Sequence, residues 1–347
     1  MDPMIVEWSD LPARDEYLWT RVEDGSVAAR LRRVIDGWAP RLGFDADRTA
    51  QVQLAVTEGA ANLHKHARQG EMLLRVSRDG PVAALEMVCV DCGPGIADVP
   101  GMMVDGRSSA GTLGVGLGSI VRMADHTGLY SLPGRGTVLT ARFQASGSPT
   151  SVPRCGGLFR PIAEEEECGD AYAACQAGDV VYAMLCDGLG HGALAARAAA
   201  EAIRVLRAGP LPGRPAELVE RIHRGIAHTR GGAVAVAAVD AAAGLVTFAG
   251  LGNVAGWVVT GERRHGMVST PGIAGHRAQG LREHVYELPP DGVVVMHSDG
   301  LTGRWGPGDY PRLFGCPPLV IAATLLRDAG VHHDDQAVLV VGPPEAR

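Results

Sequence analysis

The residues with the clearest chemical potential in this sequence are aspartates that flank apolar, strand-like runs. They are Asp170, Asp187, Asp299 and Asp334. Asp187 ends the run 180–186 and opens the turn 187–192, D-G-L-G-H-G, which leads into a helix-forming segment at 193–207. Carboxylates beside bare backbone carbonyls, such as that of Gly188, suit hard divalent cations. Neighbouring strands can gather such acids around two cations, which activate water and clamp a phosphoryl group.

Each of these acids also has an ordinary structural explanation when taken alone, as a helix cap, a turn former or a solvated tip. Asp335, next to Asp334, is an alternative ligand at the last position. His191 has the chemistry of a proton donor, but it also belongs to the glycine-rich turn. The acidic run 164–167 is typical of a solvated surface. The metal-centre hypothesis therefore depends on the whole set of aspartates.

The first half of the chain carries a different group of polar residues, placed at helical spacing. Asp45 can cap a helix that runs to about residue 67. On that helix Glu58 and Asn62 are four residues apart, so they share one face. Because the neighbouring residues are largely apolar, this polar pair is expected at the boundary of the core.

Two glycine-rich segments and a G-x-G-T sequence follow this helix. The strand-like run 82–90 ends in D-C-G-P-G at 91–95, and G-R-G-T at 134–137 opens another strand. Between them, the glycines of 111–118 precede a helix-forming segment at 119–124. Glycine-rich backbone that opens onto a helix N-terminus can cradle a phosphate.

In order and spacing these four motifs resemble the GHKL ATPases, and most of all the anti-sigma-factor serine kinases of the RsbT and RsbW kind. The resemblance covers about residues 5–145. It implies that Asn62 ligates a magnesium ion bridging the phosphates of ATP, and that Glu58 is the catalytic base that orients or deprotonates the acceptor serine. It also implies that Asp91 accepts a hydrogen bond from the adenine amino group, with support from Thr137.

The same resemblance gives the glycines their roles in binding ATP with Mg²⁺. Gly93 and Gly95 would let the backbone pass the purine, and the segment 101–118 would be a mobile lid over the phosphates. The glycines of the second box are Gly114, Gly116 and Gly118. A domain that binds nucleotide without turning it over would carry the same motifs.

The second half, over about residues 154–343, resembles the metal-dependent type 2C protein phosphatases of the SpoIIE and RsbX branch. The motifs that carry this resemblance are G-D-A-Y at 169–172, D-G-x-G-H-G at 187–192, S-D-G-L at 298–301 and D-D-x-A at 334–337. It implies that Asp187 is the central catalytic residue and bridges two Mn²⁺ or Mg²⁺ ions. Asp170 and Asp299 would complete the shell, Asp334 would bind one ion, and the Gly188 carbonyl could be a further ligand.

Together the two resemblances predict an α+β protein of two domains. An N-terminal GHKL (Bergerat) α/β sandwich, with a mixed sheet and an ATP lid, is expected over 1–145. A small, polar, proline-broken stretch at 146–153 is expected to be a linker. A type 2C phosphatase αββα sandwich is expected over 154–347.

Composition excludes several other classes of protein. The 347 residues are 46% hydrophobic and 20% charged, which is ordinary for a globular chain of two domains. A net charge of −7 and few aromatic residues argue against a nucleic-acid partner. Seven cysteines without a framework spacing suit a reducing cytoplasm. The most apolar region, 231–252, is interrupted by Asp240, so no membrane partner is expected.

The sequence therefore predicts a cytoplasmic, bifunctional signalling regulator of bacterial partner-switching type. The phosphatase would dephosphorylate phosphoserine or phosphothreonine on a STAS-domain anti-sigma antagonist, and the kinase-like half would phosphorylate the same or a related partner. Two alternatives stay open: a first domain that only senses nucleotide, or one that grips a sigma factor without chemistry. A homodimer is implied by resemblance alone.

Overall fold

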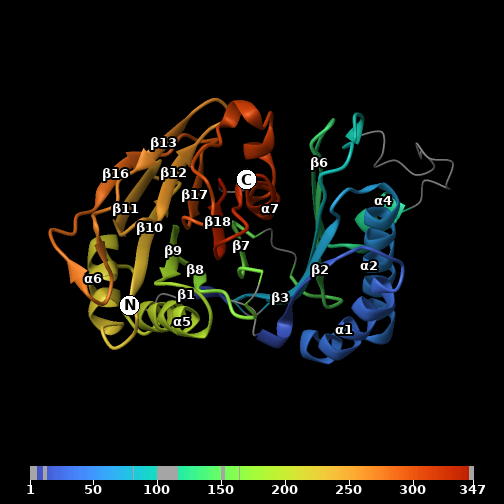
Figure 1. The fold of residues 1–347 in the computed structure, drawn as a ribbon, viewed down its shortest axis with the longest axis horizontal. Coiled ribbons are helices and arrows are strands. Elements are labelled where there is room, and N and C mark those ends of the chain that lie inside the picture. Colours follow the sequence, from blue (N-terminus) through green and yellow to red (C-terminus); the bar gives the residue numbers. More distant parts are fainter. Residues whose placement is uncertain are drawn as a thin grey trace. The chain divides into compact units, whose positions relative to one another are not determined.

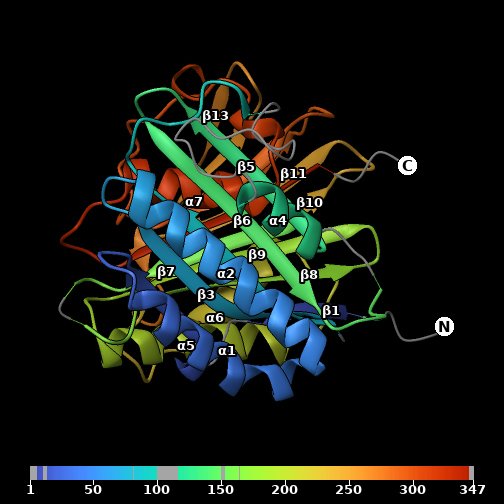
Figure 2. The same ribbon diagram turned by 90° about the vertical axis from the view of Figure 1, so that its right-hand side faces the viewer.

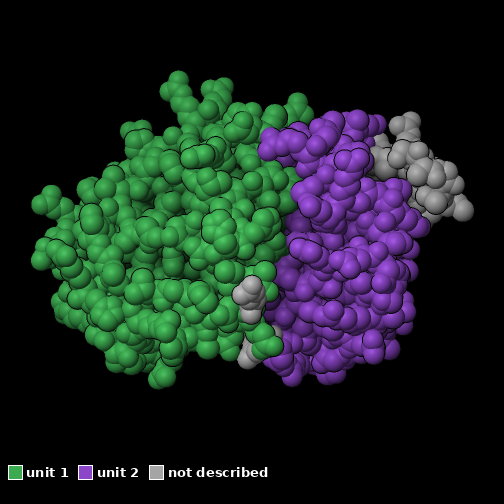
Figure 3. Space-filling model, in the orientation of Figure 1, with its two compact units in different colours: residues 1–11, 153–347 green, residues 12–152 purple. Residues whose placement is uncertain are grey.

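The chain divides into two compact units that do not coincide with its two sequence halves. The computed structural model describes residues 6–10, 14–80, 82–99, 116–149, 153–163 and 165–343. Unit 1 comprises residues 1–11 and 153–347, and unit 2 comprises residues 12–152 (Figure 3). The N-terminal residues, expected in the kinase-like domain, are thus assigned to the other unit.

A backbone ladder explains this assignment of the N-terminus. Strand β1 (Val6–Asp10) pairs antiparallel with β8 (Asp170–Ala177), with Trp8 opposite Cys175. The Trp8 ring also packs beneath the guanidinium of Arg207, 5.2 Å from its centroid. Unit 2 is therefore an insertion between the first strand of unit 1 and the rest of that unit.

Unit 2 is a sheet with helices on one face (Figure 2). Its elements are η1 (Arg14–Glu16), β2 (Tyr17–Arg21), α1 (Val27–Leu42), α2 (Ala46–His66), β3 (Glu71–Asp79), β4 (Val82–Val90), α4 (Gly116–Met123), β5 (His126–Leu132) and β6 (Gly136–Gln144). The strand order is β2-β3-β4-β6-β5. These four pairings are antiparallel, and the expected α/β sandwich of GHKL type is confirmed.

The helices of unit 2 follow from capping and from apolar spacing. The Asp45 side chain accepts a hydrogen bond from the Arg48 N–H at 2.7 Å and so begins α2 as predicted. Gly43, at φ +68°, ends α1 in the left-handed conformation that glycine tolerates. The buried faces of α1 and α2 meet the sheet in one core, which includes Leu31, Ile35, Val56, Met72, Leu85 and Phe143.

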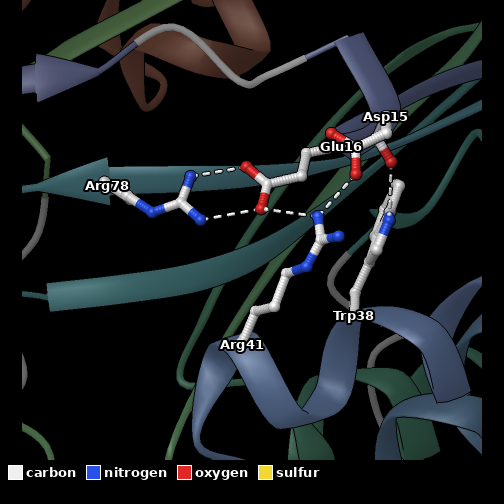
Figure 4. A network of polar contacts seen from close by, with 5 residues as sticks. All are labelled: Asp15, Glu16, Trp38, Arg41 and Arg78. Atoms are coloured by element: carbon white, nitrogen blue, oxygen red, sulfur yellow. Dashed lines mark hydrogen bonds and ion pairs between the residues drawn. The ribbon is translucent and has the colours of Figure 1, made fainter.

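A polar network joins η1, the first element of unit 2, to α1 and β3 (Figure 4). The buried Glu16 accepts two hydrogen bonds from Arg78 of β3, at 2.6 and 2.8 Å. Arg41 of α1 donates to Asp15 at 2.6 Å, and the Trp38 indole N–H donates to the Asp15 carbonyl at 2.8 Å. One short 3₁₀ turn is thereby held to both a helix and a strand.

Unit 1 is a sandwich of two sheets with helices outside them (Figure 1). The first sheet has the order β16-β11-β10-β9-β8-β1 and the second the order β13-β12-β17-β18-β7. The further strands are β7 (Cys155–Arg160), β9 (Val180–Gly188), β10 (Gly232–Asp240), β11 (Leu245–Leu251), β12 (Ala255–Val259), β13 (Arg264–Met267), β14 (Gly272–Ile273), β15 (Arg277–Ala278), β16 (His284–Glu287), β17 (Val293–His297) and β18 (Gln336–Val341). The helices are α5 (Ala193–Arg207), α6 (Pro215–Gly225) and α7 (Pro318–Ala329).

The alternation of side chains along β9 explains why that strand is continuously apolar. Tyr182 and Met184 face the core under α5 and α6, whereas Ala183 and Leu185 face the core between the two sheets. Both faces of the strand are covered, so every position selects an apolar residue. The expected αββα sandwich is confirmed, because α7 packs against the outer face of the second sheet.

Candidate metal centre and nucleotide site

Two of the predicted ligands face each other at the end of one sheet. Asp170 is the first residue of β8, and Asp187 lies next to the last residue of β9. The antiparallel register makes these two aspartates direct partners. Asp170 is only 4% exposed, and its Oδ2 atom is buried without a hydrogen-bond partner in the described part of the chain. An orphaned carboxylate oxygen of this kind calls for a positive ligand.

The second sheet supplies a third carboxylate. Asp299 lies just beyond β17, and its side chain shares a hydrogen bond with that of Asp187. Asn253, in the turn after β11, donates to Asp299 Oδ2 at 2.6 Å. Ser298, fully buried, lies close enough to Asp170 to act on the pKa of that carboxyl by lowering it. Strand ends from both sheets therefore meet in one acidic cluster.

The carboxylates of this cluster are buried close to one another, which disfavours their ionised forms. Burial raises the pKa of Asp170 to about 8, against a hydrogen bond from Ser298 and with the help of neighbouring carboxylates. Burial likewise raises the pKa of Asp187 to about 9, and the charges of Asp170 and Asp299 add to the shift. Ionising both acids is costly unless a cation shares the site.

The two consecutive aspartates at the last predicted position have different surroundings. Asp335 is 2% exposed, and its two carboxylate oxygens accept from the backbone N–H groups of Ile162 and Gly169, each at 2.8 Å. Both oxygens of Asp335 therefore hold the loop between β7 and β8 through its backbone amides. Asp334 is half-buried, and its charge contributes to the raised pKa of both Asp170 and Asp187. The geometry favours Asp334 over Asp335 as a candidate ligand.

These residues fit a divalent cation in type, since carboxylate oxygens are the ligands that such ions prefer. Within the described ranges, no three His, Cys, Asp or Glu side chains are already arranged around a single point as ligands. Instead the acids share hydrogen bonds with one another and with Asn253. The orphaned Asp170 oxygen and the raised pKa values are what a cation would relieve. Gly188 cannot be replaced easily here, because a Cβ atom would lie 2.4 Å from the Ala195 carbonyl oxygen.

In the metal-free protein, the raised pKa values of Asp170 and Asp187 predict that unit 1 loses stability as pH rises. The folded state keeps protons that the unfolded state has released, between about pH 4 and the folded pKa values of about 8 and 9. The free energy of unfolding should then fall by up to about 1.4 kcal/mol per pH unit for each such carboxyl.

This prediction can be measured by thermal unfolding in chelator at pH 5, 7 and 8.5, followed by the same series with Mg²⁺. The stabilisation by Mg²⁺ should grow with pH, because the ion replaces the protons. Asp187→Asn should flatten the metal-free pH dependence, and Asp179→Asn, on the exposed turn of the same hairpin, should not. A stability of unit 1 that rises over this pH range would contradict the prediction.

In unit 2 the predicted helix pair faces the start of α4. A Cβ atom on Gly116 would lie 2.9 Å from Glu58 Oε2 and 3.4 Å from Asn62 Oδ1. Glycine at this position therefore allows the α4 N-terminus to approach the two polar side chains of α2. Gly118 is buried within α4. Gly114, with most of the expected lid, lies outside the described residues.

The two other predicted motifs of unit 2 also come together. Asp91 accepts a hydrogen bond from the Gly93 N–H at 2.6 Å, and its own N–H donates to the Thr137 carbonyl at 3.0 Å. A Cβ on Gly136, at φ +82°, would lie 1.9 Å from the Asp91 carbonyl oxygen. A Cβ on Gly95 would lie 2.1 Å from a neighbouring carbonyl oxygen, so both glycines permit close backbone contact.

Several residues of these sites were missed by the sequence analysis. Ser131 bonds the Thr137 hydroxyl at 2.9 Å and accepts from the Ile96 N–H, but nothing in its sequence surroundings marks it. Asn253 had one weak signal, a Gly-Asn pair after a strand-like run. Ser298 was part of a recognised motif, but its contact with Asp170 depends on the packing of the two sheets.

The chain matches two families in sequence. Residues 21–143 match a family described as "Histidine kinase-like ATPase domain", and residues 177–343 match "Stage II sporulation protein E (SpoIIE)". "Serine/threonine-protein kinase RsbT" of Bacillus subtilis (strain 168) is 35% identical over 103 residues, which are 30% of this chain and 77% of that protein.

The solved structures that are similar to this chain include the following two. One, described as "The bacterial stressosome: a modular system that has been adapted to control secondary messenger signaling", is 28% identical; the match covers 54% of this chain and 97% of the other, with a TM-score of 0.49. The other, the "PP2C Phosphatase Domain and a Fragment of the Regulatory Domain" of SpoIIE from Bacillus subtilis, is 13% identical; the match covers 92% of this chain and 94% of the other, with a TM-score of 0.44.

The fold, the motifs and the family matches define a kinase-like ATPase domain fused to a type 2C phosphatase domain. Through residues 21–143 the chain belongs to the histidine kinase-like ATPase family and is related to RsbT, and its residues 177–343 form a SpoIIE phosphatase domain. Both expected resemblances are confirmed at this level. Among the described residues, no helix combines the length and apolar character needed to cross a membrane.

Proposed function

We propose that this protein is a bifunctional regulator of a partner-switching pathway. Its phosphatase domain removes phosphate from phosphoserine or phosphothreonine of a STAS-domain anti-sigma antagonist, and its ATPase domain phosphorylates the same or a related protein. The observation that carries the phosphatase half is the pairing of Asp170 with Asp187 across β8 and β9, with Asp299 beside them.

In the phosphatase domain the acids would hold two Mn²⁺ or Mg²⁺ ions. Asp187 would bridge them, Asp170 and Asp299 would complete the shell, and Asp334 and the Gly188 carbonyl would supply further oxygens. When bound, such ions activate water and neutralise the phosphoryl charge. The chain itself orients one of the acids, because the Asn253 amide donates to Asp299.

In the ATPase domain the geometry supports phosphoryl transfer from ATP. Asn62 would hold Mg²⁺ at the phosphates, and Glu58, one turn earlier on α2, would orient the acceptor serine. Asp91 would receive the adenine amino group, because its carboxylate is fixed by the Gly93 N–H. Positioning and charge neutralisation are the main requirements of this chemistry. The kinship with a serine/threonine-protein kinase supports turnover rather than binding alone.

If the ATPase domain is a kinase, Glu58→Gln should lose phosphoryl transfer and keep nucleotide binding. Loss of an acceptor-positioning carboxylate should slow transfer of the γ-phosphate to a STAS protein by roughly 10²-fold or more. Radiolabelled ATP measures transfer and a fluorescent ATP analogue measures binding. The exposed Glu23→Gln is the matched control. Wild-type protein that binds ATP but transfers nothing would make this domain a nucleotide sensor.

The phosphatase half is tested separately, by release of phosphate from a phosphoserine STAS protein with Mn²⁺. The expected result is release that stops in chelator. A protein that binds Mn²⁺ and releases no phosphate from this substrate or from a phosphoserine peptide would overturn the phosphatase proposal and leave the kinase proposal standing.

A further inference from the structure

We propose that Arg264 and His297 are positioning residues for the metal centre, because they hold the loop 298–305 that carries Asp299. The inference rests on the proposed phosphatase function, which uses Asp299 as a ligand and leaves the other two residues without a role. Arg264 begins β13 and His297 ends β17, and both strands belong to the second sheet of unit 1. Both side chains act on Asp299 through the backbone of its loop.

His297 holds the first residue of this loop through one fixed tautomer. Its Nε2 atom lies 3.2 Å from Nε1 of Trp257, and an indole N–H can only donate, so Nε2 is the acceptor. The ring proton is therefore on Nδ1, which donates to the Ser298 carbonyl at 2.8 Å. His297 is 2% exposed, so water competes little for either bond. The residue before Asp299 is thereby tied to a buried side chain.

Arg264 holds the far end of the same loop. Its guanidinium lies against two indole rings, 4.2 Å from the centroid of Trp257 and 4.7 Å from that of Trp305. From this position Nη2 of Arg264 donates to the Gly303 carbonyl at 2.8 Å. The faces of aromatic rings attract cations, and a planar guanidinium stacked on them has a fixed direction for its hydrogen bonds. The rings therefore aim the bond from Arg264 to the loop.

The two contacts with the loop join in one cluster on the outer face of the second sheet. Trp257 donates to His297 through its indole N–H and lies under Arg264 with its ring. Its neighbour Val258 belongs to the core between the two sheets, so Trp257 faces the other way. The Trp305 ring also packs 6.2 Å from the His297 ring. The cluster therefore connects the residue before Asp299 with the end of the loop.

Backbone hydrogen bonds hold the loop from another direction. The Thr302 N–H donates to the Ala329 carbonyl at 2.8 Å. The Val331 N–H donates to the Gly300 carbonyl, also at 2.8 Å. A functional side chain must be held to within about 0.5 Å of its productive position. Loss of the cluster's contacts should therefore leave the loop attached but let Asp299 shift, which weakens the binding of a metal ion.

The test is calorimetric titration of the full chain with Mn²⁺, well below its melting temperature. Arg264→Met keeps a long side chain against the rings and removes the bond to Gly303. It should weaken Mn²⁺ binding by roughly tenfold, the lower end of the effect of groups that orient metal ligands. Arg264→Lys, which can still donate but has no planar group, should fall between Arg264→Met and the wild type.

Two substitutions of His297 separate its hydrogen bond to the loop from its burial. Asparagine places an amide N–H where Nδ1 stands and can still donate to the Ser298 carbonyl, whereas glutamine places its amide near the position of Nε2. His297→Asn should bind Mn²⁺ within about threefold of the wild type, and His297→Gln should bind it roughly tenfold more weakly. Thermal unfolding in chelator shows that each variant is folded.

The matched control is Arg207→Met. Arg207 also lies over a tryptophan, 5.2 Å from the Trp8 centroid, and donates to a backbone carbonyl, that of Ser9 at 3.5 Å. It does so between α5 and β1, away from the second sheet. Arg207→Met should bind Mn²⁺ as the wild type does, even if its metal-free melting temperature falls.

The outcomes separate this inference from the function on which it rests. Arg264→Met that binds Mn²⁺ as tightly as the wild type would overturn the inference, and so would equal weakening in Arg207→Met. A wild type that binds Mn²⁺ but releases no phosphate from a phosphoserine peptide would overturn the phosphatase function alone. A wild type that binds no Mn²⁺ would overturn both.

Discussion

Replacing Asp187 by asparagine is expected to abolish metal-dependent phosphate release while leaving the ATPase domain active. Asp187 is the proposed bridging ligand and lies opposite Asp170 in the β8–β9 ladder. A bound metal stabilises the transition state by several kcal/mol, so kcat should fall by roughly 10³-fold or more. The measurement is phosphate release from a phosphoserine peptide at saturating Mn²⁺.

The fold should survive this substitution, because the asparagine removes a carboxyl whose ionisation burial opposes. Metal-free Asp187→Asn should be at least as stable as the wild type at pH 8. Isothermal calorimetry should show weakened Mn²⁺ binding in the variant, and Asp179→Asn should behave as wild type in both assays. Equal phosphatase activity in wild type and Asp187→Asn would rule out the metal-centre assignment.

The largest expected loss of stability comes from Glu86→Gln in unit 2. Glu86 lies within the sheet between Arg75 and Arg142, which donate to it at 2.7 and 2.6 Å, and all three side chains are buried. Burial acts to raise the pKa of Glu86, but the charges and hydrogen bonds of the two arginines outweigh it and lower the pKa. Glutamine removes the buried negative charge that the two arginines share, at a cost of about 3–5 kcal/mol.

Hydrogen exchange of peptides from β3 and β4 would measure this loss within unit 2. The penalty should be full above the ordinary glutamate pKa of about 4.3 and shrink as pH falls through the lower folded value, where wild-type Glu86 also becomes neutral. Glu71→Gln is the matched control on the neighbouring strand β3, since its bridge to Arg21 is 3.5 Å long and the Arg21 side chain is 76% exposed. Equal protection in wild type and Glu86→Gln would show that the triad contributes no stability.

The sequence analysis succeeded where a local pattern determines the outcome. The strand that ends at Asp187, the turn after it and the helix α5 all follow from apolar runs, glycines and helix formers that are close in sequence. The N-cap of α2 and the shared face of Glu58 and Asn62 follow from helical periodicity in the same way. Both family resemblances depended on such ordered local motifs.

The analysis failed where pairing between distant segments decides. The short strand β1 carries no signal that names its partner, and it was placed in the first domain, whereas it pairs with β8 of unit 1. The bridge from Glu165 to His191 spans 26 residues and depends on how two loops are held.

The sequence by itself determined that one chain carries two sets of motifs, one typical of phosphate transfer from ATP and the other of phosphate removal. These motifs are short, and turns, helix faces and strand ends restrict their residue types. Only the tertiary structure decided which acids meet. Packing of the two sheets brings Asp299 to Asp187. It also occupies both oxygens of Asp335 with amides of distant loops, whereas Asp334 accepts only from the adjacent Asp335 N–H. Contacts of this kind depend on the register and stacking of strands far apart in sequence, which no local pattern specifies.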